Sequence, residues 1–106
     1  MNLQQLREKL EKEFYVNNLY EMARLCKALA LDAANPASFF VMWHIFSEIA
    51  WHWEDKPLSV EEAKFVQVEI AKTIMDIIDA IEEDASGEQM NQLLNKAVSS
   101  CLFLFR

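Results

Sequence analysis

The sequence of 106 residues has very few of the residues that build tight turns. It contains one glycine and two prolines, whereas hairpin turns depend strongly on glycine and proline at defined positions. A fold made mainly of strands joined by tight turns is therefore excluded, and helices are favoured. The length matches one domain over residues 1–106, because single domains commonly hold about 100–150 residues.

Cysteines and long hydrophobic runs are also scarce. The two cysteines, Cys26 and Cys101, are too few for a disulfide framework and lie in apolar stretches, so we expect free, buried thiols. The longest run without a charged residue is Ala33 to Ser47, which is shorter than the roughly 18 residues of a membrane span. The first fifteen residues lack an apolar signal core. These features favour a cytoplasmic protein that does not enter a membrane.

Basic residues are outnumbered by acidic ones. The chain has 10 Lys and Arg against 17 Asp and Glu, a net charge of −7. Nucleic acids and anionic membrane surfaces both attract clustered Lys and Arg, so neither is an expected partner. An excess of carboxylates leaves two alternatives open, which are a basic protein partner and simple solubility.

The start signals in the chain are those of helices. A side-chain acceptor followed three residues later by Glu or Gln is the spacing of a capping box, and proline suits the first position of a helix. The pairs are Asn2 with Gln5, Asn18 with Glu21, Ser59 with Glu62 and Ser86 with Gln89, and the proline start is Asn35–Pro36. These starts predict a compact all-α bundle of about five helices, near 3–15, 19–34, 36–53, 60–84 and 87–105.

Hydrophobic spacing supports the same helices. The clearest case is the segment 60–84, where apolar residues recur at intervals of three and four. They are Ala63, Val66, Ile70, Ile74, Ile77, Ile78 and Ile81.

Residues 27–40 are locally similar to the junction between two tetratricopeptide repeats, but Trp43 stands where that repeat needs a small residue and no 34-residue period continues. The sequence therefore predicts a bundle without repeats.

One polar stripe on the helix 36–53 combines His44, Glu48 and His52. A helix rises 1.5 Å per residue, so the two histidines stand about 12 Å apart along the axis and cannot share one metal ion. We therefore expect no metal and no cofactor. The alternative is a cofactor-binding bundle in which one of these histidines ligates haem or a metal ion.

No arrangement of residues predicts catalysis. A nucleophilic cysteine needs a neighbouring base and an orienting group, whereas Cys26 and Cys101 occupy positions typical of a core. A phosphate-binding loop needs several glycines, and Gly87 stands alone. We assign no catalytic residue and expect a protein that is not an enzyme.

The negative charge is concentrated in one segment. Residues 54–84, here called the acidic segment, contain ten acidic and three basic residues, which accounts for the whole net charge of −7. Asp79, Glu82 and Glu83 lie at the end of the predicted helix, where the helix dipole favours cations. A sequence that opposes local stability in this way often does so for function.

An interface on the acidic segment is the leading hypothesis. Glu62, Glu69, Asp76 and Glu83 recur every seven residues, and Phe65 lies beside them. An aromatic anchor within a charged rim is typical of protein interfaces. These five residues predict a non-enzymatic domain that binds a basic partner. Small acidic inhibitors such as immunity proteins, which neutralise basic toxins, are similar in size and charge.

The aromatic helix 36–53 supports a different function. It carries all three tryptophans and is apolar around most of its circumference, as in the central helix of a bundle or a helix shared between subunits. Trp51 lies on its more polar side. The alternative hypothesis is therefore a homo-oligomeric structural or adaptor protein, such as a homodimer joined through Trp51.

Overall fold

The computed structural model describes residues 3–105, and all regular secondary structure in that range is helical. The elements are α1 (Leu3–Leu10), α2 (Val16–Asp32), α3 (Ala37–Asp55), α4 (Val60–Phe65), the π-helical turn η1 (Val66–Ile70), α5 (Ala71–Glu82) and α6 (Gly87–Leu104). α4, η1 and α5 follow one another without a break, so this part of the chain forms five helices. The prediction of an all-α bundle is confirmed.

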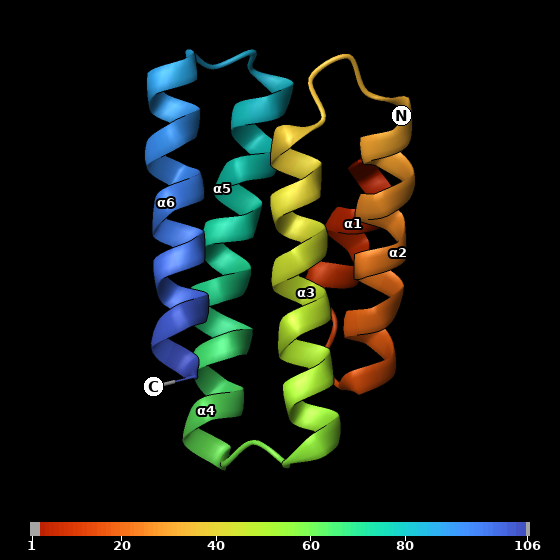
Figure 1. Cartoon of the computed structure of the whole chain (residues 1–106), viewed down its shortest axis with the longest axis vertical. Coiled ribbons are helices and arrows are strands. Elements are labelled where there is room, and N and C mark those ends of the chain that lie inside the picture. Colours follow the sequence, from red (N-terminus) through yellow and green to blue (C-terminus); the bar gives the residue numbers. More distant parts are fainter. Residues whose placement is uncertain (1–2, 106) are drawn as a thin grey trace.

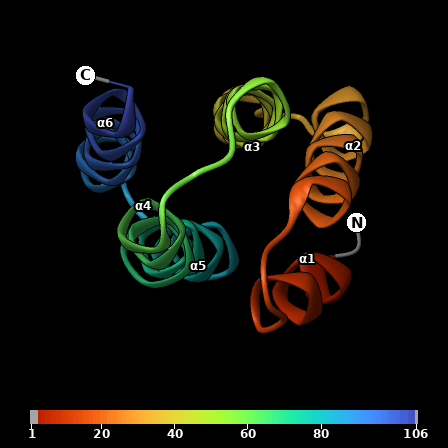
Figure 2. The same cartoon turned by 90° about the horizontal axis from the view of Figure 1, so that it is seen from below.

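The helices form two layers (Figures 1 and 2). α6, α3 and α2 lie in one layer, with α3 in the middle, and the α4–α5 helix and α1 lie in the other. α1 and α6 both pack against α5, and α2 packs along α3. One cluster of buried apolar side chains draws on all five helices. Its centre includes the fully buried residues Val66, Ile70, Ile74, Ile77 and Ile78, in agreement with the predicted apolar face.

Two predicted caps are present. Ser59 and Glu62 form a reciprocal capping box at the start of α4, and the Ser86 hydroxyl accepts a hydrogen bond from the Gln89 backbone N–H at the start of α6. At the Asn35–Pro36 start, Pro36 is the N-cap and the helix begins one residue later, without a side-chain cap. Asn2 lies outside the described residues.

The long helix ends earlier than predicted, at Glu82. Asp84 has a φ of 53°, in the left-handed region. The Ala85 backbone N–H donates to the Ala80 carbonyl at 3.0 Å, and the Asp84 backbone N–H donates to the Ile81 carbonyl at 3.3 Å. These are the two bonds of a Schellman motif, which most often has glycine at the left-handed position. Asp84 therefore ends α5, which stops two residues before the predicted end near residue 84.

The first helix is also shorter than predicted and ends at Leu10 instead of residue 15. Phe14 is still buried, but a non-helical segment carries it into the core. Gln67, in η1, fixes this segment, because its Oε1 accepts from the Phe14 backbone N–H at 2.6 Å and its Nε2 donates to the Lys12 carbonyl at 3.0 Å. Tertiary packing thus overrides the helical spacing of Leu3, Leu6, Leu10 and Phe14.

The predicted start of the second helix was wrong as well. α2 begins at Val16 and has no side-chain cap, whereas the sequence predicted Asn18 as its cap. Asn18 is buried within the first turn of α2, and its Nδ2 donates to the Glu13 carbonyl at 3.3 Å. Its amide therefore satisfies the connecting segment instead of the helix terminus.

We predict that Gln67→Ala lowers the free energy of unfolding by about 1–3 kcal/mol, because it leaves the partly buried Phe14 N–H without its partner. Urea unfolding measures the change, and hydrogen exchange should show faster exchange of the Phe14 amide. Gln92→Ala, at an exposed position of α6, is the control and should stay within about 0.5 kcal/mol. Equal effects of the two substitutions would contradict the role assigned to Gln67.

Candidate protein-binding surfaces

The π-helical turn changes how the predicted interface residues are arranged. A single π turn inserts one residue into a helix, which rotates everything beyond it by about 100° relative to an unbroken helix. The turn spans Val66–Ile70, between Glu62 and Asp76. Asp76 and Glu83 keep their spacing beyond it, but Glu62 is rotated away from their line. The four carboxylates therefore do not form the straight stripe that their sevenfold spacing predicts.

Two of those carboxylates have partners within the fold. Glu62 Oε1 accepts from the Ser59 backbone N–H at 3.0 Å, and the Ser59 hydroxyl accepts from the Glu62 N–H at 3.1 Å. The backbone hydrogen bond, and then the side-chain one, hold the pKa of Glu62 below its ordinary value. Asp76 accepts from Lys72 at 3.2 Å, one turn away. Glu62 and Asp76 are thus partly committed to helix stability.

Phe65, the predicted aromatic anchor, is partly buried and packs against the core. Its ring centroid lies 5.6 Å from that of Phe103 on α6. Phe103 is the more exposed of the two, at 63%. Phe65 therefore contributes to the packing between α4 and α6, and Phe103 gives this site its exposed aromatic surface.

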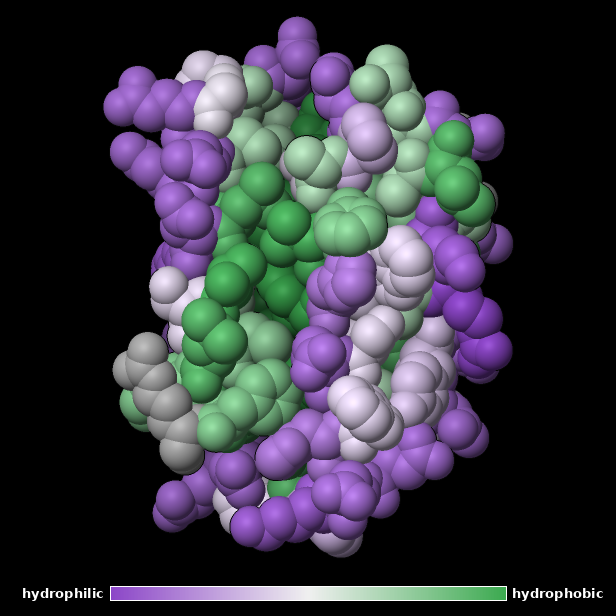
Figure 3. Space-filling view, in the orientation of Figure 1, coloured by the Kyte–Doolittle hydropathy of each residue, from purple (hydrophilic) through white to green (hydrophobic). Residues whose placement is uncertain are grey.

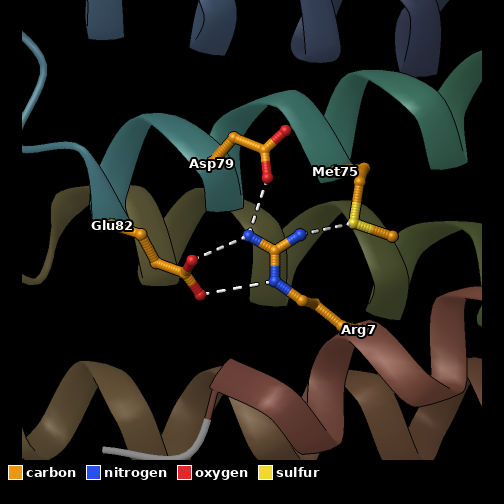
Figure 4. Close-up of polar contacts among 4 residues, drawn as sticks. All are labelled: Arg7, Met75, Asp79 and Glu82. Carbon is orange, nitrogen blue, oxygen red and sulfur yellow. Dashed lines mark hydrogen bonds and ion pairs between the residues drawn. The ribbon is translucent and has the colours of Figure 1, made fainter.

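The acids at the end of α5 hold α1 in place (Figure 4). Arg7 Nη2 lies 2.7 Å from Asp79 Oδ1 and 3.1 Å from Glu82 Oε2, and Arg7 Nη1 contacts the Met75 sulfur at 3.1 Å. The hydrogen bonds to Glu82 and then Asp79 raise the pKa of Arg7. The unfavourable position of Asp79 and Glu82 relative to the helix dipole is therefore explained by their guanidinium partner, and it does not indicate a binding site.

Five acids of the acidic segment remain exposed, and their carboxylates make no hydrogen bond or ion pair within the described part of the chain. They are Asp55, Glu61, Glu69, Glu83 and Asp84. Because the fold does not neutralise them, the segment keeps a strongly negative potential. Glu69 and Glu83 are the two predicted interface residues in this set.

A second surface, which the sequence did not predict, is an apolar hollow of about 230 Å³ between α3 and α6. We call it the α3–α6 groove. It is lined by Phe40, Val41, His44, Ile45 and Glu48 of α3 and by Val98, Cys101 and Leu102 of α6. Figure 3 shows a continuous hydrophobic strip over α6 and the space between α6 and α3, with hydrophilic side chains on the α3 side.

Large apolar side chains of the groove are exposed. Phe40 is 51% and Leu102 52% accessible to solvent. Contiguous exposed apolar surface of this kind commonly marks an interaction site. Trp51, the residue predicted as an oligomer contact, is 65% exposed on the same helix. It lines an adjoining hollow with Glu48, His52, Asp55 and Phe105, so the two hollows meet at Glu48.

The polar stripe on α3 borders these hollows. The His44 ring lies 4.4 Å from Phe40 and 5.0 Å from Trp43, between centroids, and His52 lies 4.7 Å from Phe105. Glu48 is exposed between them. Within residues 3–105, no three His, Cys, Asp or Glu side chains are grouped so that they could hold a metal ion. The stripe thus forms one edge of an apolar surface.

Both cysteines are free and buried, as predicted. Burial raises the pKa of Cys26 to about 12 and that of Cys101 to about 11, with the Glu48 charge adding to the second effect. The thiolate is the reactive form of cysteine. At neutral pH neither thiol is activated, although Cys101 forms part of the groove wall.

The chain was compared with family models, with curated proteins and with solved structures, and none of the three comparisons found a match. No helix between residues 3 and 105 is both long and apolar enough to cross a membrane.

We predict that Phe65→Ala lowers the free energy of unfolding by about 1–2 kcal/mol, less than the 3–5 kcal/mol typical of a fully buried phenylalanine. Glu69→Ala, four residues further along the same helix and exposed, should change it by less than about 0.5 kcal/mol. Urea denaturation of both variants measures the difference. A Phe65→Ala variant as stable as the wild type would restore Phe65 as a free anchor for a partner.

Proposed function

We propose that this protein is a non-enzymatic binding domain for a basic protein partner. The observation that carries the proposal is the charge that the fold leaves unneutralised, namely the five exposed and unpaired acids of the acidic segment. Four of them, Asp55, Glu61, Glu83 and Asp84, lie near the two ends of the α4–α5 helix, and Glu69 lies between. A basic protein would meet negative potential along the whole length of this helix.

We expect this charge to act mainly on the rate at which the partner associates. Fields from exposed carboxylates reach about one Debye length, roughly 8 Å at physiological salt, and they raise the rate at which oppositely charged proteins meet. A domain of this kind suits an acidic inhibitor of the immunity type, which must capture a basic toxin quickly. Affinity purification from native cells with mass spectrometry identifies the partner.

We predict that the double substitution Glu69→Lys and Glu83→Lys slows association with the co-purified partner by about tenfold or more at low salt, the scale of electrostatic steering, and flattens the salt dependence of the rate. Dissociation should change little. Neither carboxylate has a partner among residues 3–105, so the melting temperature should not fall. Biosensor kinetics at several salt concentrations measure these effects.

The matched control is Glu8→Lys with Glu88→Lys, which makes the same change in net charge at exposed acids outside the acidic segment. If both double variants slow association equally, net charge is responsible and the acidic segment has no special role. If neither changes the rate, the charge serves solubility and the proposal fails.

One observation supports self-association through α3 as a second candidate. Trp51 is 65% exposed, and a tryptophan that contributes so little to its own core is a suitable contact between subunits. Under this candidate the protein is a homo-oligomeric adaptor, and the aromatic helix is shared between subunits.

For this candidate we predict that Trp51→Glu converts dimers to monomers and leaves the thermal unfolding of the chain nearly unchanged, because an exposed side chain stabilises the monomer little. Light scattering after size exclusion measures the mass, and circular dichroism follows unfolding. A wild-type protein that is monomeric at every concentration tested would exclude the candidate.

A further inference from the structure

We infer that the α3–α6 groove binds an amphipathic helix of the partner, with its apolar face in the groove and lysines or arginines along the α3 edge. This inference rests on the proposed function for the sign of the partner's charge. It adds a binding site on the opposite layer of the bundle from α5 (Figure 2). The groove supplies contact area there, whereas the acidic segment supplies long-range attraction.

The shape of the groove suits a helix. The exposed edge of α3 from Phe40 to Asp55 covers sixteen residues, and the fifteen rises of 1.5 Å between them correspond to about 22 Å, or roughly four helical turns. The opposite wall is another helix, α6, and two neighbouring helices present the ridges and grooves into which a third helix packs. An amphipathic helix bound in a hydrophobic groove is a common mode of peptide recognition.

The charges along the groove determine the charge of the occupant. Glu48 and Asp55 lie on its α3 side, His44 and His52 lie between and beside them, and among residues 3–105 no lysine or arginine lines either hollow. Glu48 of α3 and Cys101 of α6 line the same hollow, so this carboxylate borders the apolar contact. A helix with basic residues on this side would pair with both carboxylates while its apolar residues cover Phe40, Val98 and Leu102.

A second copy of this chain fits the groove less well. Each copy carries a net charge of −7, and a symmetric dimer through this surface would bring together two copies of Glu48 and two of Asp55. Like charges placed opposite one another oppose association, and the described lining offers no lysine or arginine to neutralise them. Charge complementarity therefore favours a basic partner.

The test uses a synthetic peptide of about 18 residues, or five turns, with leucines on one face and lysines on the other. A matched peptide carries glutamates in place of the lysines. Fluorescence anisotropy with labelled peptides measures affinity, and NMR chemical shifts locate the bound peptide. We expect the leucine–lysine peptide to bind the full chain and to perturb residues 40–55 and 98–105, and we expect the leucine–glutamate peptide not to bind.

Leu102→Asp should lower the affinity for the leucine–lysine peptide about tenfold or more, because it places a carboxylate in the apolar contact. Glu48→Lys should lower the same affinity severalfold. Two matched controls should change affinity less than twofold. Val60→Asp makes a similar change at an exposed valine of α4 that is 87% accessible, and Glu69→Lys makes the same charge change on the acidic segment. Because Leu102 is half exposed, its variant should remain folded, which circular dichroism checks.

Other results would overturn the inference in distinct ways. If Glu69→Lys lowers the affinity for the leucine–lysine peptide and Leu102→Asp does not, the groove is not the binding site of the peptide, although the proposed function stands. Equal binding of both peptides would mean that charge plays no part in the groove. A wild-type dimer that Leu102→Asp dissociates would make a second copy the occupant. If neither peptide binds, the groove does not take such a helix, and the co-purified partner still tests the proposed function separately.

Discussion

Burial of the apolar face of the α4–α5 helix is the constraint on which both layers of the bundle depend. Five of its side chains, from Val66 to Ile78, are fully buried, and α1 and α6 both pack against α5. Complete burial of an aliphatic side chain is worth about 1.5–3 kcal/mol. Five of them together supply stabilisation comparable to the whole net stability of a typical domain, about 5–15 kcal/mol. The orientation of this helix therefore determines where its acids can lie.

The two candidate surfaces follow from that orientation. With the isoleucines turned inward, the acids of the same helix must either face solvent or find a partner, and Arg7 is the partner for Asp79 and Glu82. α6 packs against α5 as well as α3, so the outer sides of α3 and α6 remain uncovered along the groove. Most of the unpaired acids thus lie along the α4–α5 helix, whereas the apolar groove lies in the other layer and has Asp55 near one end.

Features of single helices could be predicted from the sequence, and features that depend on two segments could not. The Ser59–Glu62 box and the isoleucine spacing are local, and both appear in the structure. Burial of Asn18 and the shortening of α1 depend on the connecting segment and on Gln67, which is more than fifty residues away. The groove is lined by both Phe40 and Leu102, and no periodicity within either helix shows that the two residues share one hollow. The π turn has no signal in the spacing of the isoleucines.

The attachment of α1 has a consequence for the order of folding. α2 with α3, and α5 with α6, are neighbours in the chain and pack together, so each pair can form as a hairpin with little loss of chain entropy. α1 meets α5 through Arg7, whose partners lie 72 and 75 residues further along the sequence. Contacts of such long range form slowly, because the intervening chain must first be ordered. Docking of α1 is therefore the expected last step of folding, and its undocking is the first opening of the native bundle.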